Sequence, residues 1–282
     1  MANDKQKTYW TEVAGPKWLR LSGAMEARLE PVSELVIERA RLQPGERVLD
    51  VGCGTGLTSL AAARAVGLNG DVLGVDIAAP MIEAARAMAE RERAVNLRFT
   101  LGDAQTETFP PPAQALISRF GVMFFEDPVA AFTNLRRNAA PGGRLIFAAW
   151  GPVSANPHWQ KPLELAEALL GPGQPRRPHA PGPQAFDDPD YVRAILRDSG
   201  WHDYEVEVVP VFLRGASLDD EARVACFMGP SGALLDEKNA TPAQREALCA
   251  AIRAALPDYT RMTPEGRVLL PGTIHLLTAR NT

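Results

Sequence analysis

The sequence predicts an α/β protein built around one mainly parallel β-sheet, and three observations support this. Short apolar runs alternate with segments of helical periodicity from residue 47 to residue 150, which is the pattern of βαβ units. A glycine-rich turn at 52–56 joins the first apolar run to the first helical segment. The run at 145–150 is apolar throughout, as expected of a strand that is buried on both faces.

The elements predicted between residues 47 and 150 follow a regular order. Strands are expected at 47–51, 72–76, 97–101, 114–119 and 144–150, and helices at 56–66, 79–93 and 127–138. Pro80 and Pro128 stand in the first turns of their helices, where proline is tolerated, and Asp127 is placed to cap the third helix. The pair Gly142-Gly143 is predicted to break the chain before the fifth strand.

The chain on either side of this block has a less regular character. Residues 171–183 are rich in proline and glycine, which is typical of an irregular covering loop. The remaining elements are expected as helices at 24–41, 161–170, 188–199, 219–228 and 242–255, a strand at 204–213 and a last strand pair at 267–279.

The composition excludes several classes of protein. The 282 residues are 46% hydrophobic, and 30 basic against 34 acidic side chains give a net charge of −4, which is not the footprint of a nucleic-acid binder. No apolar stretch approaches the roughly 20 residues needed to span a bilayer, and the N-terminus lacks the apolar core of a signal peptide. The three cysteines fit neither a disulfide framework nor a metal knuckle. We therefore expect a cytoplasmic protein without a nucleic-acid or membrane partner, and the arginine-rich composition is typical of a bacterial gene.

The segment with the clearest chemical implication is VLDVGCGTG, residues 48–56. Gly52, Gly54 and Gly56 allow a tight turn and let backbone N–H groups approach a ligand closely. The helix that follows presents unpaired N–H groups and the positive end of its dipole. Asp76 ends the second strand 22 residues after Gly54, where a carboxylate can accept hydrogen bonds from both ribose hydroxyls. These residues predict a site for a nucleoside-containing cofactor.

Further details separate the possible cofactors. A dinucleotide fingerprint would need its third glycine at position 57, which is Leu57. Asp50 lies beside the loop, where its carboxylate would repel a pyrophosphate and suit an ammonium or sulfonium group. The chain contains no P-loop motif. Asp103 ends the third strand within LGDA, residues 101–104, where its side chain can accept a hydrogen bond from the amino group of an adenine.

These residues resemble the class I S-adenosylmethionine-dependent methyltransferases, in the small-molecule branch that includes quinone C-methyltransferases and natural-product methyltransferases. VLDVGCGTG resembles motif I of that family, GVDI at 74–77 motif II and GDA at 102–104 motif III. SRFGVMFFEDP at 118–128 and LRRNAAPGGRLIFAAW at 135–150 are similar to its fourth and fifth strand regions. The resemblance implies a Rossmann-like fold whose seven-stranded, mostly parallel sheet has an antiparallel last strand, with N-terminal and inserted helical caps.

The resemblance also implies which residues hold the cofactor, S-adenosyl-L-methionine. They are Gly52, Cys53 and Gly54 for its methionine part, Asp76 for the ribose, Ile77, Met81, Gly102, Asp103 and Ala104 for the adenine, and Ser118 and Arg119 beneath the methyl donor. Asp50 is expected beside the positive charges of the cofactor. Trp18 is expected to close over the sulfonium by cation–π attraction, although packing of an N-terminal helix onto the core accounts equally well for this side chain.

His158 is the candidate general base, because it and His179 are the histidines in the expected covering loop, where a base would be useful. The alternative interpretation of each is a surface or hydrogen-bonded loop residue. A base is not required, since the sulfonium already activates the methyl group and positioning alone can suffice. A metal site is not expected, because the sequence has no H-x-x-x-H pattern and no Cys/His cluster.

The predicted function is methyl transfer from S-adenosylmethionine to a small, largely apolar metabolite, such as a quinone or polyketide of secondary metabolism, at O, C or N. One alternative is a protein of this fold that binds S-adenosylmethionine but catalyses another reaction, such as a cyclisation. A nicotinamide-dependent oxidoreductase is the less favoured alternative, because of Leu57 and Asp50. The acceptor, the atom methylated and the oligomeric state are not predicted.

The whole chain, residues 1–282, is expected to form a single methyltransferase domain. Its expected parts are an N-terminal helical cap at 1–43, a cofactor-binding core at 44–150, a covering loop and helix insertion at 151–187, and a C-terminal completion of the sheet at 188–282 that carries a helical insertion at 215–265.

Overall fold

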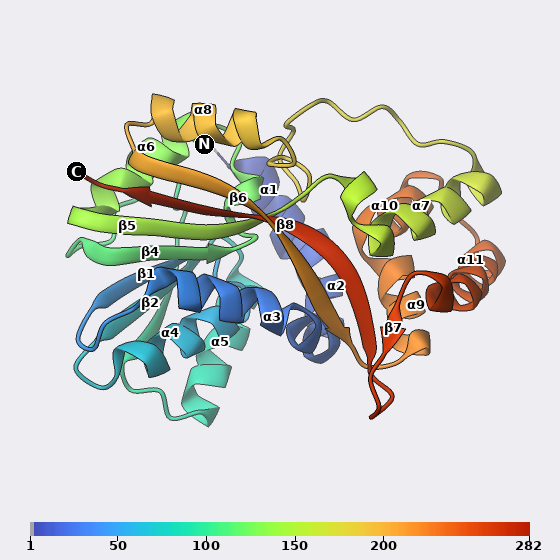
Figure 1. The fold of residues 1–282 in the computed structure, drawn as a ribbon, viewed down its shortest axis with the longest axis horizontal. Coiled ribbons are helices and arrows are strands. Elements are labelled where there is room, and N and C mark those ends of the chain that lie inside the picture. The colour runs from blue at the N-terminus through green and yellow to red at the C-terminus, as the bar shows by residue number, and fades with distance from the viewer. Residues whose placement is uncertain (1–2) are drawn as a thin grey trace.

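One sheet of eight strands runs through the computed structural model, which describes residues 3–282 (Figure 1). Its strand order is β3-β2-β1-β4-β5-β8-β6, and β7 pairs with β8 off this path. β8 is antiparallel to its neighbours, and the pairs from β3 to β5 are parallel. The strands are β1 Arg47–Val51, β2 Asp71–Asp76, β3 Leu97–Leu101, β4 Ala113–Arg119, β5 Ala139–Trp150, β6 His202–Gly215, β7 Arg261–Met262 and β8 Val268–Arg280. The predicted α/β fold with a mostly parallel sheet is confirmed.

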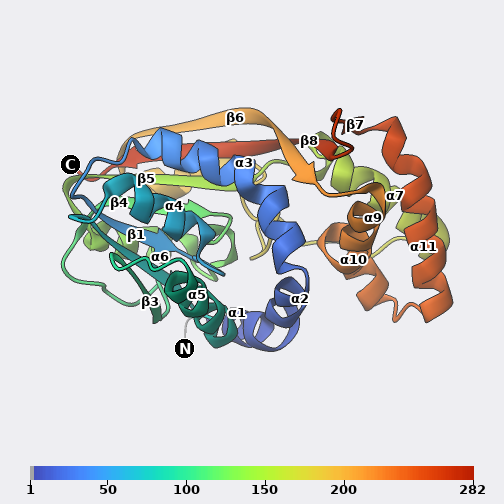
Figure 2. The ribbon, with the colours of Figure 1, turned by 90° about the horizontal axis from the view of Figure 1, so that it is seen from below.

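Helices cover both faces of this sheet, with α3, α4 and α5 on one face and α6 and α8 on the other (Figures 1 and 2). These helices are α3 Ser22–Ala40, α4 Leu57–Val66, α5 Ala79–Arg91, α6 Pro128–Asn138 and α8 Pro189–Asp198. Asp127 caps α6 as predicted, because its side chain accepts a hydrogen bond from the backbone N–H of Ala130 at 3.0 Å. Burial on both faces explains the apolar composition of β4 and β5.

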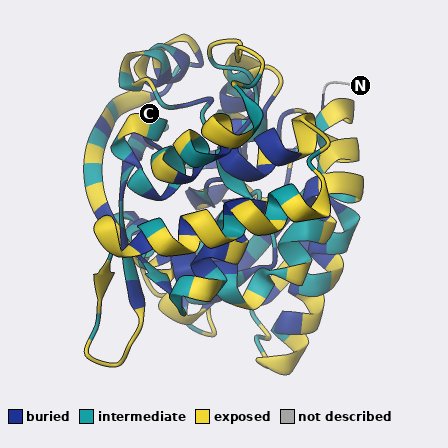
Figure 3. Cartoon of the chain, turned by 90° about the vertical axis from the view of Figure 1, so that its right-hand side faces the viewer, coloured by how far each residue is buried: buried dark blue, intermediate teal, exposed yellow. Residues whose placement is uncertain are grey.

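A helical cap stands beside the sheet, and β6 and β8 extend out of the sheet to reach it (Figure 1). The cap consists of α7 Pro157–Leu170, α9 Leu218–Phe227, α10 Gly229–Glu237 and α11 Pro242–Ala255, followed by the short 3-10 helix η4 Leu256–Asp258. Seen from outside, the cap helices carry exposed residues on their outer side and buried residues beneath (Figure 3).

The N-terminal segment is helical from Asp4 onward. It forms α1 Asp4–Thr8, the π-helix η1 Tyr9–Ala14 and α2 Gly15–Arg20 before α3 begins. These short helices lie between α5 and the cap (Figure 2). Sequence periodicity predicts only the helix over 24–41, because the earlier elements are too short to show a repeat.

Several predicted boundaries are wrong, each for a local reason. Gly142-Gly143 lies inside β5, whose register with β4 shifts between Ala113 and Ala115, so the glycines accommodate an irregularity instead of a break. The run at 267–279 is a single strand, β8, and its hairpin partner β7 has only two residues. α7 begins at Pro157, four residues earlier than predicted. The helix α10 and three short 3-10 helices, η2 Val122–Phe124, η3 Val153–Ala155 and η4, were not predicted.

The register of the sheet determines where the candidate functional residues lie. Val48 pairs with Val72 in β2 and with Ala115 in β4, so these three parallel strands end at the same edge. The residues that follow each strand therefore meet at that edge.

Candidate active site

A cavity of about 870 Å³ opens at the carboxyl ends of the strands, between the N-terminal helices and the cap. This volume is in the upper part of the range of about 300–1,000 Å³ that is usual for ligand pockets. Thirteen of the fourteen site residues predicted from the sequence line it: Trp18, Asp50, Gly52, Cys53, Gly54, Asp76, Ile77, Met81, Gly102, Asp103, Ala104, Arg119 and His158.

Two glycines of the turn after β1 are needed for different reasons. Gly52 has φ +65°, and a Cβ at this position would lie 2.6 Å from the Cα of Gly121. Gly54 has φ +55°, and a Cβ there would meet nothing within 4 Å, so this residue turns its bare face toward open space. The first glycine therefore allows two backbone segments to pack together, and the second leaves the loop backbone accessible to a ligand.

Asp76, at the end of β2, holds the glycine turn in place. Its Oδ2 accepts a hydrogen bond from the backbone N–H of Gly54, and its Oδ1 accepts one from the backbone N–H of Ala78, both at 2.9 Å. Burial raises the pKa of this carboxyl, and the two backbone hydrogen bonds oppose that effect. Each carboxylate oxygen retains a second lone pair for a ligand hydroxyl.

Asp50 is a buried carboxylate with one oxygen left unsatisfied. The side chain is 1% exposed, and its Oδ2 accepts a hydrogen bond of 2.5 Å from the hydroxyl of Ser59. Its Oδ1 has no hydrogen-bond partner within residues 3–282. Burial raises the pKa of Asp50 to about 7, against the opposing effects of Ser59 and the positive charge of Arg119. A cationic ligand group at this wall would satisfy the free oxygen, so the side chain fits the ammonium of an amino-acid moiety.

Asp103 is joined to the N-terminal segment. Its Oδ1 accepts hydrogen bonds from the side-chain amide of Asn3 at 2.8 Å and from the backbone N–H of Gln105 at 2.9 Å. The Oδ1 of Asn3 in turn accepts one from the backbone N–H of Glu126 at 2.9 Å. Asn3 was missed by sequence reasoning, because a single polar residue near the N-terminus carries no pattern.

Ser118 and Arg119 differ in where they point. The hydroxyl of Ser118 donates to the carbonyl of Val51 at 2.7 Å and accepts from the N–H of Gly121 at 3.2 Å. Among the described residues it is the one predicted site residue that does not line the cavity. Arg119 does line it and donates to the hydroxyl of Ser33 at 2.9 Å. Burial lowers the pKa of this guanidinium, which remains a cation.

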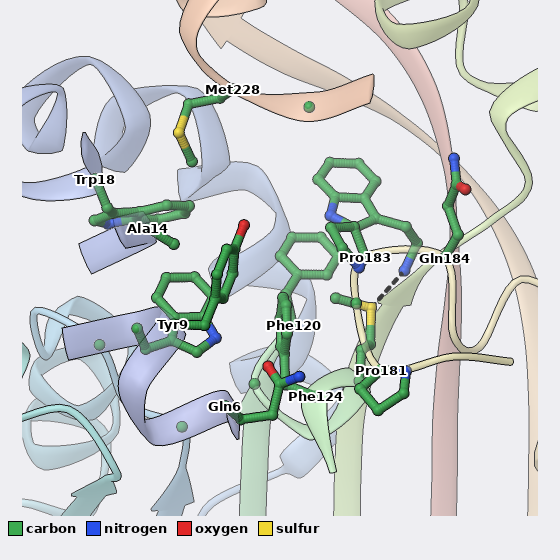
Figure 4. A pocket seen from close by; sticks show the side chains of 18 of the residues that line it. Gln6, Tyr9, Ala14, Trp18, Phe120, Phe124, Pro181, Pro183, Gln184 and Met228 are labelled. Atoms are coloured by element: carbon green, nitrogen blue, oxygen red, sulfur yellow. Dashed lines mark hydrogen bonds between the residues drawn. The ribbon is translucent and has the colours of Figure 1, made fainter. Parts of the chain in front are cut away.

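Aromatic side chains form much of the remaining wall, and Figure 4 shows Tyr9, Trp18, Phe120 and Phe124 around the same space. Trp10 makes edge contacts with Phe124, at a centroid distance of 5.0 Å, and with Trp18, at 6.4 Å. Phe120 stacks on Trp150 with centroids 4.2 Å apart and an interplanar angle of 4°. The wall next to the glycine turn therefore suits a flat, apolar ligand.

His158 lies in the first turn of α7, so its expected place in a loop is wrong. The side chain is 3% exposed, and its Nδ1 lies 3.3 Å from the carbonyl oxygen of Pro271. Because a carbonyl oxygen can only accept, Nδ1 carries the hydrogen and Nε2 presents a lone pair. Nε2 has no hydrogen-bond partner in the described chain. Burial, reinforced by the charge of Arg28, lowers the pKa of His158 to about 3.

A buried ion pair also borders the cavity, and sequence reasoning missed it. Arg28 of α3 lines the cavity and donates through Nη1 to Glu221 of α9, and the two residues are 5% and 3% exposed. Charged residues on amphipathic helices normally indicate a solvated face. The sequence therefore does not indicate that these two residues are buried, because their contact depends on the packing of α3 against the cap.

Within residues 3–282, no group of three or more His, Cys, Asp or Glu side chains is arranged to hold a metal ion. The helices that the structure describes include none that is long and apolar enough to cross a membrane.

Comparison with known proteins identifies a family and several relatives. Residues 48–143 match the family described as "Methyltransferase domain". The chain is 36% identical over 120 residues to aklanonic acid methyltransferase DauC of Streptomyces sp. (42% of this chain, 54% of the relative). It is 32% identical over 158 residues to nocamycin O-methyltransferase of Saccharothrix syringae (54% and 53%). It is 31% identical over 178 residues to demethylmenaquinone methyltransferase of Thermus thermophilus (60% and 78%). The chain thus spans about half the length of the first two relatives and more than two thirds of the third.

Solved structures show the same fold at low sequence identity. The YcgJ protein of Bacillus subtilis matches with a TM-score of 0.53 and 19% identity, over 88% of this chain and 97% of that one. The cyclase SpnF matches with a TM-score of 0.52 and 20% identity, over 88% and 80%. At these identities the likeness concerns the fold alone, because one fold serves many activities.

Proposed function

The chain belongs to the class I S-adenosylmethionine-dependent methyltransferases, and we propose that it transfers the methyl group of this cofactor to a small, largely apolar metabolite. The observation that carries the proposal is the continuity of the cavity. It joins the glycine turn and Asp76 to a chamber bordered by Phe120, Trp150 and Trp159. A polar cofactor site that opens directly into an aromatic chamber suits a reaction between S-adenosylmethionine and an apolar partner.

The residues at the cofactor end fit S-adenosylmethionine by their chemistry. The unsatisfied oxygen of Asp50 would bind the ammonium group, and the bare face of Gly54 leaves room for the methionine part. Asp76 would hold the ribose hydroxyls with its free lone pairs, and Asp103 would accept from the adenine amino group. When bound, S-adenosylmethionine supplies a methyl group that is already activated by its positive sulfonium.

The chain's own part in the reaction is mainly to position the acceptor and exclude water. Trp10 and Trp18 also line the cavity, and an aromatic face turned to the cofactor would favour its sulfonium cation. His158 lines the chamber, and its buried Nε2 has no hydrogen-bond partner within residues 3–282. We assign it the role of accepting a hydrogen bond from the acceptor, because its lowered pKa disfavours the general-base role expected from the sequence.

The acceptor class is supported by the size and composition of the chamber and by the relatives. Two relatives are named for aklanonic acid and nocamycin, and a third for demethylmenaquinone. A quinone or polyketide of similar character is the acceptor class that we propose for this chain. The N-terminal helices and the cap at α7, α9 and α10 would provide the acceptor pocket, within one domain.

The test has two parts. Calorimetry should show micromolar binding of S-adenosylhomocysteine and no binding of NAD. Binding of NAD without binding of S-adenosylhomocysteine would contradict the proposal. Quinones and polyketide phenols are then incubated with S-adenosylmethionine, and each product is measured together with S-adenosylhomocysteine. Methylation consumes one S-adenosylmethionine and releases one S-adenosylhomocysteine for each acceptor consumed, whereas a cyclisation would consume the acceptor and leave S-adenosylmethionine intact.

A further inference from the structure

The acceptor chamber is apolar on most sides but has one polar wall. Trp150, Trp159 and Phe120 give it flat apolar surfaces, with ring centroids of Trp150 and Trp159 4.7 Å apart. On the cap side the same cavity is bordered by Arg28 and His158. These two buried polar side chains are not needed by the cofactor end of the site.

Burying the guanidinium of Arg28 at this position costs desolvation free energy. It comes from α3, whose end nearest α2 lies toward the cap (Figure 2), and its Nη1 is held by Glu221 of α9. A buried ion pair is weak evidence for stability, because desolvation offsets the attraction of the two charges. The guanidinium has five N–H donors in a planar fork, and Glu221 holds Nη1. Arg28 can therefore present further donors to the cavity that it lines.

His158 supplies the complementary group. Its Nδ1 hydrogen is directed to the carbonyl of Pro271, and this contact fixes Nε2 as an acceptor. Its ring packs against both Trp150 and Trp159, at centroid distances of 5.6 Å and 5.4 Å. Arg28 lies near enough for its charge to lower the pKa of His158, so the imidazole is neutral at pH 7. The polar wall thus combines a cationic donor with a neutral acceptor.

We propose that Arg28 and His158 form a recognition site for an acceptor that carries a weakly acidic hydroxyl beside a carbonyl group. The hydroxyl donates to Nε2 of His158, and the carbonyl oxygen accepts from the guanidinium of Arg28. The acceptor class is therefore the hydroxyaryl ketones and related enols, with their aromatic part against Trp150. Glu221 is a positioning residue that orients Arg28. This inference rests on the proposed function, because it specifies the substrate of the same chamber.

The test measures binding of two probes to protein saturated with S-adenosylhomocysteine. Hydroxyacetonaphthone carries a phenol beside its ketone, and acetonaphthone lacks the hydroxyl. Calorimetry on the wild-type chain should show tighter binding of the hydroxyl compound by up to about tenfold, because its hydroxyl, which otherwise donates to its own ketone, also donates to Nε2. Equal affinities, or a preference for acetonaphthone, would overturn the inference.

Variants locate the preference at the polar wall. His158→Phe keeps an aromatic ring against the two tryptophans but removes the hydrogen-bond acceptor, so the preference should disappear while acetonaphthone binding is retained. The double variant Arg28→Met with Glu221→Leu replaces the ion pair with apolar side chains, a change that cores tolerate. It should weaken binding of both ketones, since each carries the carbonyl. A preference that persists in His158→Phe would overturn the assignment, as would unchanged binding of both ketones in the double variant.

The two proposals fail in different ways. S-adenosylhomocysteine affinity and the melting temperature are recorded for every variant, which shows that the chain is folded and the cofactor end intact. If the wild-type chain does not bind S-adenosylhomocysteine, the proposed function is contradicted. Normal S-adenosylhomocysteine binding without discrimination between the probes would contradict only the recognition site at Arg28 and His158.

Discussion

The carboxylate of Asp76 accepts a hydrogen bond of 2.9 Å from the backbone N–H of Gly54, which joins the end of β2 to the glycine turn after β1. The side chain proposed to bind the ribose therefore also fixes the turn proposed to hold the methionine part of the cofactor. Loss of this carboxylate should affect both ends of the cofactor at once.

The first prediction concerns Asp76→Asn. The amide keeps one oxygen but cannot accept hydrogen bonds at both positions, so one backbone donor loses its partner. We expect S-adenosylhomocysteine affinity to fall tenfold to a hundredfold, as the loss of charge-assisted hydrogen bonds implies. Asp71→Asn is the matched control, since Asp71 begins the same strand and pairs with Arg47 and Arg98 at the opposite edge. An unchanged dissociation constant in Asp76→Asn would refute the ribose assignment.

A second prediction compares two glycines of one turn. In Gly52→Ala the methyl group would lie 2.6 Å from the backbone of Gly121, so we expect a loss of several kcal/mol of stability. In Gly54→Ala the methyl group meets nothing, and only the positive φ costs about 1–2 kcal/mol. The melting temperature, measured with and without S-adenosylhomocysteine, distinguishes a loss of stability from a loss of ligand binding. Gly54→Ala should melt a few degrees lower yet lose most of its ligand-induced stabilisation, and retention of that stabilisation would show that the loop is not a ligand site.

The cofactor end of the site could be predicted from the sequence because it follows from strand order. Asp50, Asp76 and Asp103 each lie at or just after the carboxyl end of a parallel strand, and such ends meet at one edge of a sheet. Ser118 also lies near such an end, but its hydroxyl bonds to Val51 within the sheet. The face of the sheet to which a strand residue points is indicated by the alternation of polar and apolar residues along the strand. The residues directly before Ser118 are all apolar, so they do not show which way its side chain points.

The acceptor end could not be predicted in the same way. Arg28 and Glu221 are 193 residues apart, and their contact depends on how α3 and the cap pack together. The unsatisfied Nε2 of His158 depends on a carbonyl of β8, over a separation of 113 residues. No local spacing encodes either relationship, so tertiary structure is needed to find them.

A third prediction uses the pKa of Asp50, which burial raises to about 7 against Ser59 and Arg119, with a further contribution from the charge of Asp76. A bound ammonium stabilises the ionised carboxylate, so cofactor binding should release a proton below that pH. S-adenosylhomocysteine affinity should therefore rise with pH up to about 7, by as much as tenfold per unit, and then level off. Calorimetry between pH 5.5 and about 8.5 measures this slope. Asp50→Asn should bind more weakly and without the slope, and an identical slope in the variant would assign it to another group.

A fourth prediction concerns the stability of the ion pair between α3 and the cap. Arg28→Met leaves Glu221 as a buried, unpaired charge, which should lower the free energy of unfolding by about 3–5 kcal/mol. Adding Glu221→Leu removes that charge and should restore most of the loss. Chemical denaturation of the single and double variants gives the coupling between the two sites. Additive losses would mean that the two side chains do not interact in solution.

The last prediction follows from the neutral state of His158. Its pKa is lowered from 6.5 to about 3 by burial and by Arg28, so below pH 6.5 the unfolded chain binds a proton at this residue that the folded chain does not. Stability should therefore be lost as the pH falls, by up to about 1.4 kcal/mol per pH unit between 6.5 and 3. His158→Phe removes this contribution and leaves the other titrating groups in place. The difference in unfolding free energy between wild type and variant should be constant above pH 7 and should shift steadily in favour of the variant below pH 6.5. A difference that stays constant down to pH 4 would show that His158 binds its proton equally well in the folded and the unfolded chain, which would contradict a lowered pKa for this buried imidazole.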